Sequence, residues 1–442
     1  MTTFASLALA AALSASAPDP RVAQLTSAVD PARMQATVAK LVSFGTRHTL
    51  SDAQSPSRGI GAARRWLAAE LASLAAQPGS RLQPFEDPFT QPAAPRIPRP
   101  VEIWNVGAVL PGTDPARGKE AIVLTGHYDT RASDVMNATI DAPGADDDGS
   151  GTALVLELAR VMAREKPAVS IYFVAVAGEE QGLNGSTHLA QRLRGEGVRV
   201  LAMTAIDMIG NSDGQDGVHD DVSARLFSEG VPAAETPAER KLREAVGGEN
   251  DGAARAWARY VKRVGERYVE NLDLWVMLRR DRLGRGSDHL AFSKEGFPAI
   301  RLVEAHEHWD RQHQDLRTED GRAYGDVLAH VDFAYAAKLG RALLAAVAEL
   351  AAAPAPPIGV SLGGAASPET RLTVALPRDS RVAGLVLYRR RADGVSWGRA
   401  IRYPRQPEII LKGVVPDNFV FAIATVDADG HESLPGFPGK LE

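Results

Sequence analysis

Four short segments carry acidic and histidine side chains that could do chemistry: three directly follow a run of apolar residues, and one opens a predicted helix. The segments are residues 126–129, residues 144–151, residues 178–180 and Asp207. Their ionisable side chains are His127, Asp129, Asp146, Asp147, Asp148, Glu179, Glu180 and Asp207. Because ligands and catalytic groups gather at the carboxyl ends of the strands of an open α/β sheet, we expect these side chains to lie close together. Carboxylates at such short range raise one another's pKa unless a cation neutralises them, and a pair of divalent cations would do so.

The chain contains no cysteine, which limits the chemistry of a metal site. Disulfides, thiolate zinc sites, iron–sulfur clusters and cysteine nucleophiles are excluded, so any metal must be held by imidazole and carboxylate ligands. Such ligands suit zinc and, less selectively, manganese or cobalt. Asp147, in a glycine-flanked turn at a helix N-terminus, is placed to bridge two ions. A further imidazole must come from residues 304–313, which hold His306, His308 and His313.

Each segment taken alone has a structural explanation. Aspartates at the start of a helix are favoured by capping and by the helix dipole, and the two glutamates would equally suit the first turn of a helix. The inference of a metal site therefore rests on the four segments together, at one edge of one sheet.

The apolar runs predict the elements that position these residues. Short, nearly continuous runs are typical of parallel strands that helices cover on both faces. They occupy residues 121–125, 169–177, 200–206 and 299–303, with an extended segment at 101–109. Helical periodicity marks residues 31–76 and 149–165, and the proline-rich residues 77–100 predict a loop. The pattern predicts an α/β fold, a three-layer sandwich around a mostly parallel mixed sheet.

The length of 442 residues predicts more than one folding unit. Residues 211–285 separate two strand-like runs by more than an ordinary connection and predict an insertion, helical over residues 253–278. Residues 351–357 are a stiff Ala-Pro linker, after which residues 358–442 predict a small all-β sandwich. The acidic residues number 55 and the basic residues 50, so nothing indicates a nucleic-acid partner.

The start of the chain indicates export. Residues 4–13 form an apolar run too short to span a bilayer, and the small residues 15–17 fit a cleavage site. We therefore expect a signal peptide at residues 1–17 and a secreted or periplasmic protein, although residues 1–3 lack Lys and Arg and an Ala-rich helix is the alternative. Beyond the first twenty residues no apolar stretch is long enough to predict a membrane span.

In order and spacing, the four segments resemble the co-catalytic zinc exopeptidase family that includes bacterial leucyl aminopeptidases and glutamate carboxypeptidases, with glutaminyl cyclases as relatives. The similarity covers about residues 36–350 and is most specific in residues 143–151 and 177–186. It implies a zinc peptidase domain at residues 18–353, with the insertion at 211–285. The tail, at 358–442, resembles a fibronectin type III module.

The resemblance also implies the roles of individual residues. Two zinc ions would share Asp147. His127 and Asp207 would complete one site, and Glu180 and His313 the other. Glu179 would be the general acid/base, and Asp129 would orient His127. At His313 the chain departs from the family, which more often has a hydroxyl residue soon afterwards and an aspartate four positions on, where this chain has Gln314 and Arg317.

The function that we expect is hydrolysis of amino-terminal residues from peptides. Alternatives of the same fold are a carboxypeptidase and a glutaminyl cyclase; a complete set of two-metal ligands argues against the cyclase. A binding protein with structural metals is a further alternative, but it has no use for the spare carboxylate of Glu179. The basic residues 279–285 either favour an anionic peptide end or form a solvated face. The remaining histidines are given no role: His48, His188, His219, His289, His330 and His431.

Overall fold

The computed structural model describes residues 18–398 and 400–441. The predicted signal peptide at residues 1–17 lies outside this range and stays a prediction. The described residues form two compact units. The first, the sheet unit, consists of residues 19–234 and 257–351; the second, the C-terminal unit, consists of residues 235–256 and the residues from 352 on. No helix in the described ranges is both long and apolar enough to cross a membrane.

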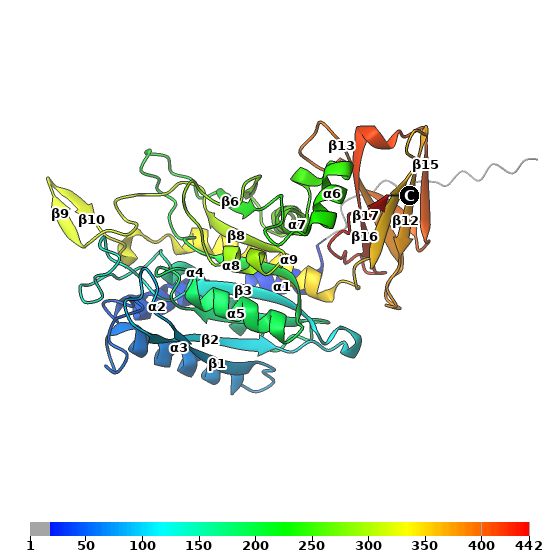
Figure 1. The fold of residues 1–442 in the computed structure, drawn as a ribbon. Coiled ribbons are helices and arrows are strands. Elements are labelled where there is room, and N and C mark those ends of the chain that lie inside the picture. Colours follow the sequence, from blue (N-terminus) through cyan, green and yellow to red (C-terminus); the bar gives the residue numbers. More distant parts are fainter. Residues whose placement is uncertain (1–17, 399, 442) are drawn as a thin grey trace, which may run out of the picture. The chain divides into compact units, whose positions relative to one another are not determined.

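The sheet unit contains an eight-stranded mixed sheet in the order β1-β2-β4-β3-β5-β8-β6-β7 (Figure 1). Its strands are β1 (Gln83–Gln91), β2 (Val101–Leu110), β3 (Glu120–His127), β4 (Ser170–Val176), β5 (Arg199–Ile206), β6 (Ser223–Ser228), β7 (Asp273–Met277) and β8 (Ala299–Glu304). The central strand β3 runs parallel to β4 and β5, and β5 runs parallel to β8. The predicted α/β fold with a mostly parallel mixed sheet is confirmed.

Helices cover both faces of this sheet. They are α1 (Pro20–Ser27), α2 (Pro31–Val42), α3 (Gly59–Ala75), α4 (Gly149–Met162), α5 (Asn184–Gly195), α7 (Ala253–Tyr268), α8 (His289–Lys294) and α9 (Phe333–Ala352). On one face Val123 of β3 packs in a core with Leu189 of α5 and Phe292 of α8. On the other face α4 approaches so closely that a Cβ on Gly126 would lie 2.6 Å from the backbone nitrogen of Thr152. Because side chains alternate along a strand, Val123 and Gly126 face opposite layers.

Within the proline-rich residues 77–100, where the sequence predicts a loop, Gln83–Gln91 form the strand β1. Pro84 and Pro88 lie inside β1, which pairs with β2 alone and forms an edge of the sheet. A proline cannot donate a ladder hydrogen bond, but an edge strand has one side on which no such bond is needed. The prediction of a loop was therefore wrong for residues 83–91, because prolines argue against a central strand but can be accommodated in an edge strand.

The predicted helical insertion at residues 211–285 is helical only in part. Helix α7 ends at Tyr268, and β7 follows after Asn271, which has a left-handed backbone with φ of 52°. Strand β6 pairs antiparallel with β8, and β7 pairs parallel with β6. This segment thus extends the main sheet by two strands, and the prediction of a helix running to residue 278 was wrong.

The C-terminal unit contains two β-sheets, ordered β15-β12-β11-β17 and β14-β13-β16. The strands are β11 (Gly359–Gly363), β12 (Glu369–Ala375), β13 (Gly384–Arg391), β14 (Ile401–Pro404), β15 (Glu408–Lys412), β16 (Phe419–Val426) and β17 (Pro438–Leu441). Leu372 and Ile409 of one sheet share a core with Leu385 and Phe421 of the other, so the sheets pack face to face. The two packed sheets agree with the predicted β-sandwich, whereas the more specific resemblance to a fibronectin type III module stays a prediction.

A buried ion pair ties residues 235–256, which include α6 (Pro237–Val246), to the β-sheets of the C-terminal unit. The guanidinium of Arg390 donates to the carboxylate of Asp251, and both side chains are almost fully buried. We expect Asp251→Ala to lower the free energy of unfolding of this unit by about 3–5 kcal/mol, because it leaves an unpaired charge buried.

Denaturant titration of the full chain, with a spectroscopic probe in the C-terminal unit, would measure this effect. The matched control is Arg391→Ala, which removes an exposed pair with Asp393 from the next position in the same strand and should cost at most about 0.5 kcal/mol. Equal effects of the two substitutions would show that the buried pair does not hold the segment.

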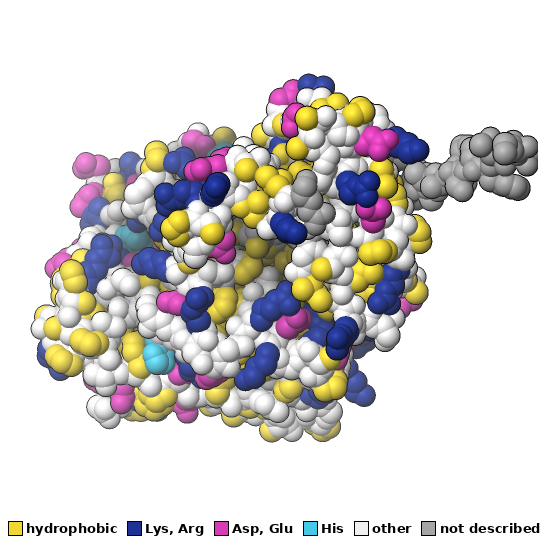
Figure 2. All heavy atoms as spheres, turned by 45° about the vertical axis from the view of Figure 1, so that its right-hand side comes forward, with side chains coloured by type: hydrophobic (Ala, Val, Ile, Leu, Met, Phe, Trp, Pro, Cys, Tyr) yellow, Lys and Arg dark blue, Asp and Glu magenta, His cyan; other side chains and the backbone are white. Residues whose placement is uncertain are grey.

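The surface reflects the balanced composition. On the part of the face in Figure 2 that the structure describes, Lys and Arg side chains are interspersed with Asp and Glu and with apolar side chains. This face therefore carries no extended field of one sign.

Candidate active site

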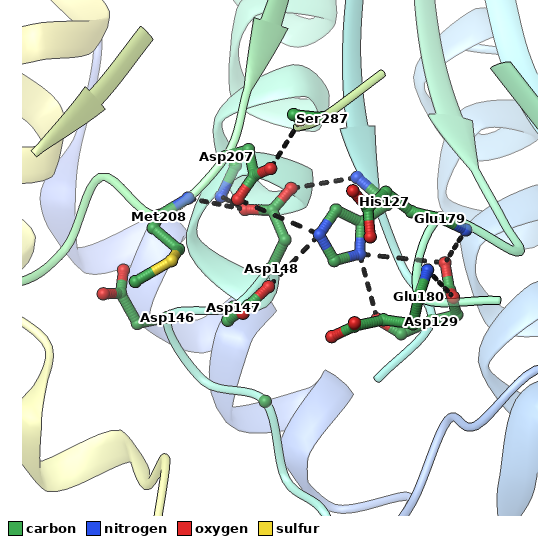
Figure 3. Close-up of polar contacts among 12 residues, drawn as sticks. His127, Asp129, Asp146, Asp147, Asp148, Glu179, Glu180, Asp207, Met208 and Ser287 are labelled. Carbon is green, nitrogen blue, oxygen red and sulfur yellow. Dashed lines mark hydrogen bonds and ion pairs between the residues drawn. The ribbon is translucent and has the colours of Figure 1, made fainter. Parts of the chain in front are cut away.

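The predicted residues meet at the carboxyl ends of neighbouring parallel strands (Figure 3). His127 is the last residue of β3, Glu179 and Glu180 follow β4, and Asp207 follows β5. Asp147 lies in the turn before α4, whose N-terminus is capped by the carboxylate of Asp148. These strands are adjacent in the order β4-β3-β5, so their ends converge on one region as expected.

Two groups of potential metal ligands share Asp147. The first is His127, Asp147 and Asp207, and the second is Asp147, Glu180 and His313; within each group the ligand atoms lie within 4.8 Å of one another. His127 Nε2 is 3.2 Å from Oδ1 of Asp147. His313 Nε2 is 2.9 Å from Oδ2 of Asp147 and 3.1 Å from Oε1 of Glu180. The two oxygens of one carboxylate thus face two different imidazoles.

The electrostatics of these groups fit divalent cations. Burial lowers the pKa of His313, but Glu180 and Asp147 outweigh it and raise this pKa to about 10. Burial raises the pKa of Asp147, but the two imidazoles outweigh it and hold this pKa well below its usual range. In the bare protein, a proton on each imidazole would therefore offset part of the negative charge. A metal ion takes the place of such protons, and imidazole–carboxylate donor sets suit zinc.

Glu179 lies beside these ligands without belonging to either group. Its backbone N–H donates to Oδ1 of Asp129, while its side-chain oxygens accept no hydrogen bond from the described residues. Burial raises the pKa of Glu179 well above its usual value, Glu180 and Asp207 push it in the same direction, and His127 opposes them. A carboxyl group with a raised pKa next to a metal site can both accept and return a proton.

Asp129 supports two parts of the site. Its carboxylate accepts the backbone N–H groups of Glu179 and Glu180 and the hydroxyl of Thr49. The imidazole Nδ1 of His127 lies 3.2 Å from the Asp129 backbone carbonyl oxygen and 3.7 Å from carboxylate Oδ1. A proton on Nδ1 leaves Nε2 free to bind a metal. The closer partner of His127 is thus the carbonyl oxygen, whereas the carboxylate mainly fixes the turn that holds the two glutamates.

Three supporting residues were given no role from the sequence. Oδ2 of Asp148 accepts the backbone N–H of His127 at 2.9 Å, and Oδ1 accepts that of Met208 at 3.3 Å. Asp207 accepts the Ser287 hydroxyl at 2.5 Å and the Arg301 guanidinium at 2.9 Å. Arg301 is fully buried in β8, and a lone arginine in an apolar strand is a signal in the sequence that it has an acidic partner.

Arg47 is a fourth supporting residue that the sequence does not reveal. Its guanidinium is fully buried and donates to the backbone carbonyl oxygens of Tyr128, Pro143 and Gly144. Burial lowers its pKa to about 10 although nearby aspartates raise it, so it remains charged at neutral pH. Arg47 therefore joins the loop after His127 to the loop that leads to Asp147.

The structure separates the three histidines that compete in the sequence. His306 pairs with Asp216 at 2.9 Å, and His308 lines a small pocket that includes Asp146 and Glu304. Among the described residues of segment 304–313, His313 is the imidazole that lies with Asp147 and Glu180. Two of the histidines left without a role, His48 and His289, are buried against backbone carbonyl oxygens.

Comparison with known proteins identifies a peptidase family and related zinc metalloproteases. Residues 105–332 match the model of peptidase family M28. A probable zinc metalloprotease of Leptosphaeria maculans is 39% identical over 423 residues, which cover 96% of this chain and 97% of that protein. Another probable zinc metalloprotease, from Pyrenophora tritici-repentis, is 40% identical over 425 residues, covering 95% and 87%.

The solved structure of LapA from Legionella pneumophila has a similar fold. Its TM-score is 0.52 at 21% identity, and the match covers 75% of this chain and 76% of that one. A second structure of the same protein, which matches with a TM-score of 0.50 at 21% identity over 74% of each chain, is described as that of an aminopeptidase. At this identity the likeness concerns the fold alone.

Proposed function

The chain belongs to peptidase family M28 and is a zinc metallopeptidase, and from that premise we propose that it is a two-zinc aminopeptidase, which removes amino-terminal residues from peptides. The observation that carries the proposal is the position of Asp147 between two ligand groups, with Glu179 beside them. The fold shared with the aminopeptidase LapA also supports it.

In this proposal His127, Asp147 and Asp207 would hold one zinc ion, and Asp147, Glu180 and His313 would hold the other. When bound, the zinc ions would lower the pKa of a water molecule and polarise the scissile carbonyl group. Glu179 takes a proton from the attacking water molecule while the water oxygen forms a bond to the carbonyl carbon. As the C–N bond breaks, Glu179 returns that proton to the leaving amine. Asp129 and Arg47 hold the loops that carry these groups.

Three versions of one tripeptide would test the proposal. Zinc-loaded protein is incubated with Leu-Gly-Gly, its N-acetylated form and its C-amidated form, and the products are identified by mass spectrometry. We expect leucine to be released from the free and amidated peptides, whereas the acetylated peptide is not cleaved. Cleavage of the acetylated peptide with release of its last residue would instead identify a carboxypeptidase.

Parallel incubation with Gln-Gly-Gly distinguishes the cyclase alternative. Loss of ammonia without hydrolysis of a peptide bond would indicate a glutaminyl cyclase and would contradict the proposal. If the zinc-loaded protein left every peptide unchanged, the metals would be structural and the chain a binding protein.

A further inference from the structure

Two arginines of the loop between β7 and α8 differ in whether a carboxylate neutralises their charge. Arg282 donates to Oε2 of Glu307 at 2.5 Å, and its side chain is 10% exposed. Arg285, three positions later, is exposed and forms no ion pair with a carboxylate in the described part of the chain. Instead its guanidinium Nη1 lies 3.4 Å from Nδ1 of His313. An uncompensated cation therefore stands directly beside one of the imidazoles that we assign to the metal site.

The tautomer of a metal-bound imidazole makes this contact unusual. The Nε2 atom of His313 faces Asp147 and Glu180, so this nitrogen is the one that would bind a metal. A neutral imidazole that binds a metal through Nε2 carries its hydrogen on Nδ1. Both His313 Nδ1 and Arg285 Nη1 would then be hydrogen-bond donors, and two donors cannot bond to each other.

The other imidazole of the site, His127, has an oxygen partner at Nδ1, which His313 lacks among the described residues. Nδ1 of His127 has the carbonyl oxygen of Asp129 at 3.2 Å and its carboxylate Oδ1 at 3.7 Å. Metal-binding histidines generally donate their second N–H to such an oxygen. In the described residues His313 has an arginine in that place. An oxygen-bearing anion placed between Arg285 Nη1 and His313 Nδ1 could accept hydrogen bonds from both donors. Planar carboxylates are the usual partners of a guanidinium group.

We propose that Arg285 and the Nδ1–H of His313 together bind a carboxylate group of the substrate. The proposal rests on the proposed function and adds to it a preference for peptides with a carboxylate close to the scissile bond. Two sources have this chemistry: the terminal carboxylate of a dipeptide and the side chain of an acidic residue. Because Arg285 is exposed, a bound peptide can reach it from solvent.

Kinetic selectivity tests this proposal. The kcat/KM ratio of Ala-Ala to Ala-Ala-amide reports recognition of a terminal carboxylate, and the ratio of Glu-anilide to Gln-anilide reports recognition of an acidic side chain. Loss of a hydrogen bond to a charged group should make Arg285→Met lower one of these two ratios by about tenfold. The matched control is Arg279→Met, another exposed arginine of the loop, which should leave both ratios within about twofold of wild type.

Binding provides a readout that does not depend on turnover. Isothermal titration of Ala-Ala and Ala-Ala-amide, and of Glu-amide and Gln-amide, into zinc-loaded Glu179→Gln protein should show tighter binding of one carboxylate member. Adding Arg285→Met should remove that difference. If wild-type protein hydrolyses no peptide, the proposed aminopeptidase function fails, and the titration still decides whether Arg285 binds a carboxylate. If Arg285→Met leaves both kinetic ratios and both affinity differences unchanged, the inference is overturned.

Discussion

Replacing Glu179 with glutamine is expected to lower kcat for peptide hydrolysis by about 10²–10⁴-fold while zinc stays bound. Glutamine has nearly the same shape but cannot take a proton from water. Glu179 belongs to neither ligand group, and its side-chain oxygens accept no hydrogen bond from the described residues, so the substitution removes little structure. The measurement combines steady-state kinetics with the zinc content of the purified variant.

The neighbouring glutamate is the matched control for this prediction. Glu180 lies with Asp147 and His313 in a ligand group, so Glu180→Gln should lower the zinc content as well as the activity. The two adjacent substitutions therefore separate proton transfer from metal binding. A Glu179→Gln variant that keeps more than about a tenth of the wild-type kcat would be incompatible with Glu179 as the general base.

Replacing Asp147 with alanine is expected to abolish activity and to weaken both proposed zinc sites at once. Its two carboxylate oxygens face His127 and His313 separately. Among the described residues, Asp147 is the one that belongs to both ligand groups, so its loss affects both. The loss of zinc affinity should exceed the roughly 100-fold that results when only a hydrogen-bonding partner of a ligand is removed. Zinc content after dialysis against a weak chelator, together with kcat/KM, would measure it.

Two further variants show whether this loss is specific. Asp207 belongs to one ligand group, so Asp207→Ala should release zinc mainly from that group. His306 pairs with Asp216 outside both groups, so His306→Ala should keep its zinc and stay within about twofold of wild-type activity. If the Asp147 variant retained all of its zinc, Asp147 would not be the bridge.

Much of the site could be predicted from sequence because its residues follow buried strands. The runs that become β3, β4 and β5 are apolar since helices cover them on both faces, and the reactive residues come directly after them. Parallel strands bring their carboxyl ends to one edge, so order along the chain was enough to group His127, Glu179 and Asp207. The two strands between β5 and β8 were missed because neither is a continuous apolar run: β6 contains Ser223, Arg225 and Ser228, and β7 lies at the sheet edge and is only partly buried.

Other features depend on contacts between distant residues and leave no local pattern. Arg47 precedes Pro143 by 96 positions, and its partners are backbone carbonyl oxygens, which have no signature in a sequence. Asp251 and Arg390 are 139 positions apart, so nothing local indicates that residues 235–256 pack with the C-terminal sheets. Arg285 appeared from sequence only as part of a basic run, and its position beside His313 distinguishes it from its neighbours.

The arrangement of the metals is the claim on which the mechanism depends, and anomalous diffraction at the zinc edge from crystals of the zinc-loaded protein tests it most directly. We predict two peaks about 3.5–4 Å apart, one on each side of Asp147. One should lie about 2.0–2.2 Å from His127 Nε2 and Asp207, and the other at the same distance from Glu180 and His313 Nε2. A single peak, or two peaks that do not share Asp147, would contradict the account.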